Sequence, residues 1–154
     1  MNRSGKIGVE FQPKDDDFIA TVSIQDLTNV SEDINNVLKW ASETYGISTK
    51  RMMSILKENE NIRRHGQKIP AVFFWDLGNT IFELLENLSS RGLEFEDLYG
   101  HLVRDLHISR TTIKRAVALR RYVPQKEMLS PNVTWGSCKD APKKFASGLL
   151  RRNK

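Results

Sequence analysis

The sequence predicts an all-α protein: a helical bundle that contains a helix-turn-helix, preceded by a short β-hairpin or arm at the N-terminus. Three observations carry this prediction. From Ser31 onward, apolar residues recur at intervals of three and four, the spacing of one helix face. Strand-like runs of β-branched residues occur within residues 1–30. The segment 98–122 has the pattern of two helices joined by a three-residue turn.

The first predicted unit is an N-terminal arm or β-hairpin, residues 1–30. Segments 6–11 and 18–24 are rich in β-branched residues, and the polar segment 12–17 between them is typical of a turn. Two strands alone are marginally stable and need a surface to pack against. An arm that docks on a partner subunit is the open alternative.

The second predicted unit is a pair of helices, residues 31–68. Ser31 would cap the first helix and Gly46 would end it; Ser48 would cap the second, which would run to about residue 59. Residues 42–56 align with the later motif at an offset of 61 residues. We interpret this segment as a helical corner, with a degenerate second helix-turn-helix as the alternative.

The third predicted unit is a helical domain, residues 69–138, followed by a basic C-terminal tail, residues 139–154, with a short helix after Pro142. Pro70 favours the first turn of a helix that runs to about Ser90. One apolar stripe on this helix suits either a core or a dimer interface. The stripe consists of Phe74, Leu77, Ile81, Leu84 and Leu88.

The helix-turn-helix is predicted at residues 98–122. The first helix would end near Leu106, and the second would begin at Arg110 with Ser109 as its N-cap. In DNA-binding proteins with this motif, the second helix enters the major groove. Apolar residues that would hold the two helices together are Leu102, Leu106, Ile108, Ile113 and Ala116 or Val117.

The outward face of the second helix would be cationic and free of carboxylates. Arg and Lys pair with guanine edges or phosphates, and Thr can contact a thymine methyl, so we predict binding to double-stranded DNA. Residues expected at this DNA-binding face are Ser109, Arg110, Thr111, Lys114, Arg115, Ala118 and Arg121, with sequence preference carried by Arg110 and Lys114. Additional phosphate contacts are expected from Arg104, Lys126, Lys139, Lys143, Lys144, Arg151 and Arg152.

The charge distribution agrees with this prediction. Residues 1–100 carry 11 Lys and Arg against 16 Asp and Glu, whereas residues 101–154 carry 13 against 3, a net charge of +10. Such a surplus attracts polyanions. A basic tail that only increased solubility would give the same net charge, so charge alone does not identify DNA as the partner.

The residues Asp105–Val117 resemble the centre of phage-repressor-type helix-turn-helix motifs. Two positions depart from that pattern. His107 replaces the turn glycine, although histidine tolerates the left-handed conformation that such a turn uses. Val103 replaces the small residue at the point where the two helices touch.

A wider resemblance covers residues 73–140. The motifs FWDLGNTI, LVRDL, YVP and SPNVTW follow in that order, with Ser109 after the second, and the segment resembles the helical N-terminal domain of the YhcG-type nuclease family. In that family a PD-(D/E)XK nuclease domain follows. Here the sequence stops at Lys154 and contains no Glu-x-Lys or Asp-x-Lys. The resemblance therefore implies a DNA-engaging helical part without the catalytic part.

The function classes that remain are few. With no apolar run near the roughly 18 residues of a membrane helix, no secretory signal and the single cysteine Cys138, we expect a cytoplasmic protein with no membrane contact. No cofactor motif, zinc spacing or catalytic constellation occurs, so we predict a non-enzyme without cofactor or metal. Asp15, Asp16 and Asp17 leave a metal-dependent nuclease of unrecognised type as a remote alternative.

We therefore predict a homodimeric transcriptional regulator or DNA-targeting subunit, because such readers commonly pair symmetric half-sites. The dimer interface would come from the apolar stripe of residues 74–88 or from the N-terminal arm. The main alternative is a protein–protein adaptor, or an assembly subunit of a nuclease system, whose basic third docks on an acidic partner.

Overall fold

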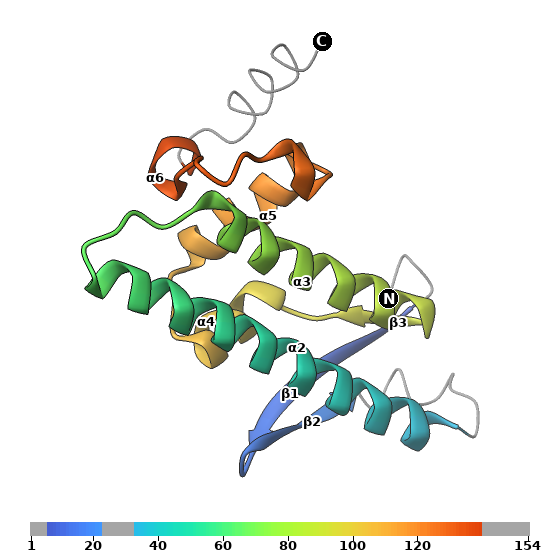
Figure 1. Cartoon of the computed structure of the whole chain (residues 1–154). Helices are drawn as coiled ribbons and strands as arrows, with labels where there is room; N and C mark the ends of the chain where they lie inside the picture. The colour runs from blue at the N-terminus through green and yellow to red at the C-terminus, as the bar shows by residue number, and fades with distance from the viewer. Residues whose placement is uncertain (1–5, 23–32, 140–154) are drawn as a thin grey trace.

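The structure, a computed structural model, describes residues 6–22 and 33–139 (Figure 1). The elements in chain order are β1 (Ile7–Lys14), β2 (Asp17–Val22), α2 (Ile34–Arg64), α3 (Ala71–Ser90), β3 (Leu93–Phe95), α4 (Leu98–Leu106), α5 (Arg110–Tyr122), the 3-10 helix η1 (Lys126–Met128) and α6 (Trp135–Cys138). The helix expected after Pro142 and the cap expected at Ser31 lie outside the described residues.

The prediction of an all-α protein is wrong, because the fold contains a three-stranded mixed sheet of order β2-β1-β3. The N-terminal segment is the predicted hairpin: β1 pairs with β2 antiparallel, from Val9 opposite Val22 to Lys14 opposite Asp17. The third strand was missed. This strand, β3, has only three residues, which are too few to show an alternating pattern. It follows the C-terminal end of α3 and pairs parallel with Ile7–Val9 of β1.

The prediction of two helices within residues 31–68 is also wrong. α2 is one continuous helix of 31 residues, and the segment 42–56 lies wholly inside it, which excludes a second helix-turn-helix there. Gly46 does not end a helix. It is buried, and a Cβ at this position would approach Oδ1 of Asp17 to 3.0 Å, so the glycine allows the hairpin to pack closely on α2.

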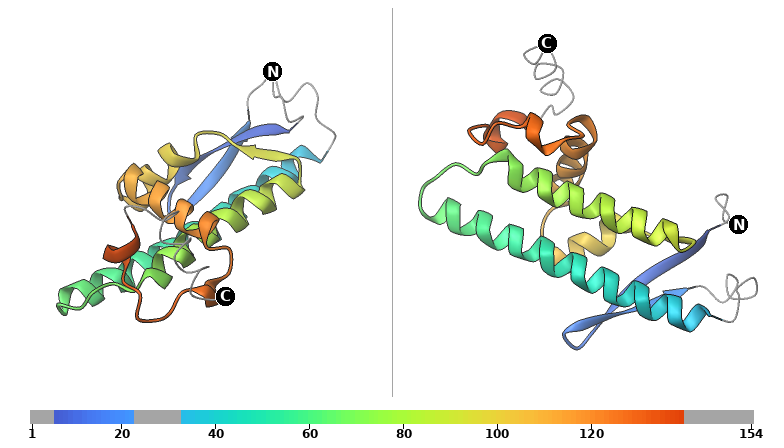
Figure 2. Two further views of the ribbon diagram at one scale, coloured as in Figure 1. Left: turned by 90° about the horizontal axis from the view of Figure 1, so that it is seen from above. Right: turned by 45° about the vertical axis from the view of Figure 1, so that its right-hand side comes forward.

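The helices and the sheet form two layers. α2 and α3 run side by side in one layer, and the sheet and α4 lie across them, as the view from above shows (Figure 2). α5 packs against α3, and the segment after α5 returns to the start of α3, where Trp135 stacks on Phe74 with ring centroids 4.0 Å apart. The described part of the chain contains no helix that is both long and apolar enough to span a bilayer.

The apolar stripe of α3 belongs to the core of the chain itself. α3 begins after Pro70 and ends at Ser90, as predicted. Its residues Leu77, Ile81, Leu84 and Leu88 are completely buried and Phe74 is nearly so, within one cluster that includes residues of β1, α2, α4 and α5. The suggestion that this stripe forms a dimer interface is therefore wrong, because α2 and α5 already cover it.

α3 and α5 approach each other closely at Gly78. A Cβ built on Gly78 would lie 2.3 Å from the carbonyl oxygen of Ala116, far inside van der Waals contact. Only glycine fits at this crossing without moving a backbone. The position of α5, and with it the second half of the helix-turn-helix, is thus set by a backbone contact with α3.

Candidate nucleic-acid interface

The helix-turn-helix is present where the sequence predicted it. α4 ends at Leu106, and His107 adopts the left-handed conformation with φ 55° and ψ 39°. α5 begins at Arg110, and Oγ of its N-cap Ser109 accepts a hydrogen bond from the Thr112 N–H at 3.1 Å. His107 therefore takes the backbone conformation usually given to glycine, and Ser109 is confirmed as the cap.

Apolar side chains hold the two helices together. Leu102 and Leu106 of α4 are buried, as are Ile113, Ala116 and Val117 of α5, while Ile108 in the turn is partly buried. Val103 is 37% exposed, so it is more accessible than the buried residues of the two helices.

The outer face of α5 holds the predicted DNA-binding residues. Ser109, Arg110, Thr111, Lys114 and Arg121 are exposed, and Arg115 and Ala118 are partly buried. Thr111, Lys114, Ala118 and Arg121 follow one another at intervals of three and four, so they share one face, opposite the buried residues of α5. The sequence has no Asp or Glu from 106 to 126, so the only charges on this face are positive.

A tyrosine of α4 contacts two of these cations. Arg110 Cζ lies 5.4 Å and Lys114 Nζ lies 5.6 Å from the ring centroid of Tyr99, within the range of cation–π attraction. Sequence reasoning missed Tyr99, because no spacing rule pairs a residue of the first helix with the outer face of the second. Only the crossing of α4 and α5 brings these three side chains together.

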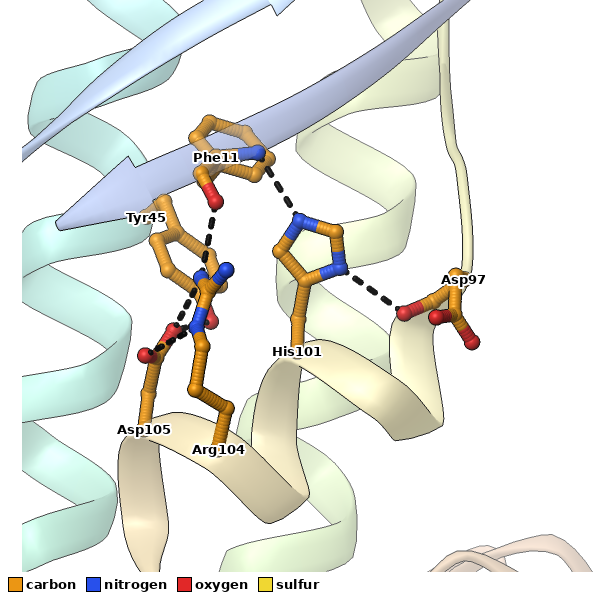
Figure 3. A network of polar contacts seen from close by, with 6 residues as sticks. All are labelled: Phe11, Tyr45, Asp97, His101, Arg104 and Asp105. Carbon is orange, nitrogen blue, oxygen red and sulfur yellow. Dashed lines mark hydrogen bonds and ion pairs between the residues drawn. The ribbon is translucent and has the colours of Figure 1, made fainter.

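Arg104, predicted to contact phosphate, has hydrogen-bond partners inside the protein. Its Nε donates to Oδ1 of Asp105 at 2.7 Å, and its Nη2 donates to Oδ2 of the same carboxylate and to the carbonyl oxygen of Phe11, at 2.9 and 2.7 Å (Figure 3). These contacts use the Nε and Nη2 donors of the guanidinium inside the protein. The phosphate contact expected of Arg104 stays a prediction, because the side chain is 37% exposed.

Tyr45 and Asp105 extend this network into α2. The Tyr45 hydroxyl donates to Oδ2 of Asp105 at 2.5 Å, and the Asp105 side chain is only 4% exposed. Burial, followed by the hydrogen bond to Asp105, raises the pKa of Tyr45 well above its ordinary value. The hydrogen bond to Asp105 is the main cause of the raised pKa of Arg104, so the guanidinium remains charged at any pH at which the protein folds.

His101 attaches α4 to the same strand. Its Nε2 accepts the Phe11 N–H at 2.9 Å, and its Nδ1 lies 2.8 Å from the carbonyl oxygen of Asp97 (Figure 3). Since Nε2 is an acceptor and a carbonyl can only accept, we assign the neutral tautomer with the proton on Nδ1. His101 and Arg104 therefore provide hydrogen-bond partners for the backbone N–H and C=O of Phe11. Among the described residues, Phe11 has no strand partner on this side, because β3 pairs only with Ile7–Val9.

The remaining predicted cations differ in their surroundings. Lys126 is close to Asp76, with Nζ 3.0 Å from Oδ1, and so is partly neutralised. Lys139 follows α6 and is partly buried. Arg120, which was not predicted to contact DNA, donates to Asn79 and lies over the rings of Trp75 and Phe82. The tail residues Lys143, Lys144, Arg151 and Arg152 lie outside the described residues.

Two other candidate sites have little chemical support. Asp15 and Asp16 form the hairpin turn and Asp17 begins β2; in residues 6–22 and 33–139, no three His, Cys, Asp or Glu side chains are grouped to hold a metal ion. Cys138 is buried, and burial raises the pKa of its thiol to about 11. A thiol of that pKa is a poor nucleophile at neutral pH.

No protein-family model, no curated protein and no solved structure matches the chain in comparisons with known proteins.

Proposed function

We propose that the protein binds double-stranded DNA without catalysing a reaction, and that α5 enters the major groove as a recognition helix. A transcriptional regulator or DNA-targeting subunit that acts as a homodimer in the cytoplasm is the role that fits this activity. The resemblance of residues 73–140 to the helical domain of the YhcG-type nucleases points in the same direction.

One observation supports this proposal above the others. Helix α5, capped by Ser109, combines helix-turn-helix packing with an outer face that has cations along its whole length and no carboxylate. A helix face that served only solubility would normally intersperse acidic and basic residues. A face of one sign is expected where the partner is a polyanion.

The first test is titration of the full chain onto a random-sequence duplex by fluorescence anisotropy at several salt concentrations. Each phosphate neutralised contributes about −0.9 to the slope of log K against log salt concentration, so a face with four or more phosphate contacts gives a slope of about −4 or steeper. Absence of binding at about 50 mM salt, where phosphate contacts are strong, would contradict the proposal.

A matched pair of variants locates the binding face. Arg121→Ala removes an exposed cation from α5, and Lys57→Ala removes an exposed cation from α2. We expect Arg121→Ala to make the salt slope shallower by about one and Lys57→Ala to leave it unchanged. Equal effects of the two variants would show that binding follows net charge and not the outer face of α5.

Docking on an acidic protein is the competing function. Ile47 is 69% exposed and Met53 is 51% exposed, both on α2, and an adaptor would bury such side chains against its partner. An adaptor would fail to bind the duplex at low salt and would instead form a stable complex with one acidic protein, so the same titration separates the two functions.

A further inference from the structure

Two cations of the outer face of α5 converge on one aromatic ring. Arg110 and Lys114 are four residues apart, so they are neighbours of like charge and repel each other. The Tyr99 ring attracts both, at 5.4 and 5.6 Å from its centroid. In the described ranges neither cation forms an ion pair with a carboxylate. The result is a concentrated positive charge at the start of the second helix.

The ring holds these cations without occupying their hydrogen-bond donors. The guanidinium of Arg104 shows the opposite arrangement, since Asp105 and the Phe11 carbonyl accept its N–H groups. An aromatic face attracts a cation by its quadrupole and takes up none of the in-plane N–H groups of a guanidinium lying over it. Arg110 and Lys114 are therefore positioned and still able to donate.

The ring itself has a fixed position. Tyr99 lies two residues before His101, whose Nε2 accepts the Phe11 N–H of β1, and five residues before Arg104, which donates to the Phe11 carbonyl. These bonds fasten α4 to the sheet. Tyr99 is partly buried and packs against the core, so its orientation is set by the fold and not by the cations.

We propose that Tyr99, Arg110 and Lys114 form a binding site for one phosphodiester of the nucleic-acid backbone, in which Tyr99 is the positioning residue. The inference rests on the proposed function. The planar fork of Arg110 suits two oxygens of a phosphate, and the ammonium of Lys114 supplies a second charge beside it. This group anchors the register of α5 and leaves Thr111 and Ala118 for the base edges.

This assignment changes the expected role of two residues. The sequence alone suggested that Arg110 and Lys114 carry sequence preference. As phosphate ligands they would contribute equally on every duplex, because phosphate contacts carry no sequence information. Arg110→Ala and Lys114→Ala should each reduce the affinity for specific and random duplexes by the same factor.

The test uses two substitutions of Tyr99 in the full chain, with a random-sequence duplex as the probe. Tyr99→Phe keeps the ring and should bind within about twofold of the wild type, whereas Tyr99→Leu removes it and should bind about three- to tenfold more weakly. In a Lys114→Ala background the effect of Tyr99→Leu should be smaller, since one of the two positioned cations is already absent.

The possible results distinguish the positioning role of Tyr99 from duplex binding by the protein as a whole. If the wild type binds the duplex while Tyr99→Leu binds as tightly, or Tyr99→Phe loses as much as Tyr99→Leu, the positioning role is wrong and DNA binding stands. A wild type that binds no duplex at low salt overturns both. An undiminished effect of Tyr99→Leu in the Lys114→Ala background indicates a general packing defect and also overturns the inference.

Discussion

The backbone N–H of Phe11 donates to Nε2 of His101 at 2.9 Å, so a side chain of α4 takes the place of a strand partner for β1. The bond joins residues 90 positions apart in the sequence. The carbonyl of Phe11 is satisfied from the same helix, by Arg104. The first helix of the helix-turn-helix is thus fastened to the sheet by hydrogen bonds to a single residue.

Removal of this bond should destabilise the fold. His101→Phe keeps an aromatic ring beside Phe11, Tyr45 and Phe95 but leaves the buried Phe11 N–H without an acceptor. An unsatisfied buried donor costs about 1–3 kcal/mol, so we expect the free energy of unfolding in urea to fall by that amount. Unchanged stability would mean that the Phe11 N–H finds another partner.

The bond between Tyr45 and Asp105 should be detectable as an energetic coupling. Tyr45→Phe removes the donor, Asp105→Asn removes the charge of the acceptor, and the double variant removes both. Because the Asp105 side chain is buried and also binds Arg104, we expect a coupling energy of about 1–2 kcal/mol from urea unfolding of the four proteins. Additive losses would show that the two residues act independently.

The same tyrosine should make the protein sensitive to alkali. Burial and Asp105 raise the pKa of Tyr45 in the folded state, so the unfolded chain loses this proton first, above its ordinary pKa of about 10. Stability contributed by the neutral phenol is complete below that pH and declines above it. We expect Tyr45→Phe to remove part of the loss of stability between neutral and strongly alkaline pH.

The local features of this protein were predictable from its sequence. The turn at His107, the cap at Ser109 and the helix beginning after Pro70 each depend on neighbours within a few positions, and the structure has all three. Spacing also identified the exposed residues of α5, because a helix displays its outer face at intervals of three and four.

The non-local features were not predictable. β3 pairs with Ile7–Val9 across more than 80 residues of chain, and a strand of three residues has no periodicity of its own. Glycine is typical of a helix end, but α2 continues through Gly46. The burial of Tyr45 and Met52 on either side stabilises the continuous helix by more than the cost of about 1 kcal/mol for a glycine inside a helix. The bonds of Arg104 to Asp105 and to the Phe11 carbonyl were not predictable either, because the sequence does not show that α4 lies against β1.

The crossing of α3 and α5 should tolerate no side chain at Gly78. Gly78→Ala gains helix propensity, but its Cβ would lie 2.3 Å from the Ala116 carbonyl oxygen and would force the two helices apart. Overpacking of this kind costs about 1–3 kcal/mol. Gly136→Ala in α6 is the matched control, since nothing lies within 4 Å of its Cβ. Thermal unfolding of the two variants should differ by several degrees.

Cys138 should resist alkylation in the folded protein. Its thiol is buried and its pKa is raised to about 11, whereas an ordinary thiol has a pKa of about 8.5. At pH 8 we therefore expect slow reaction with iodoacetamide, and rapid reaction once urea unfolds the chain. Rapid labelling of the native protein would show that the segment containing α6 opens away from α3.

Arg104 and Arg121 should separate stability from nucleic-acid binding. Arg104→Gln breaks the bonds to Asp105 and Phe11, and because the Arg104 side chain is 37% exposed the loss of stability should be modest, about 1–2 kcal/mol. Its salt slope for duplex binding should equal that of the wild type, since an internally bonded guanidinium releases no counterion from DNA. Arg121→Ala should show the reverse, with full stability and a slope shallower by about one. If Arg104→Gln alters the slope without loss of stability, its guanidinium leaves Asp105 on binding and contacts phosphate after all.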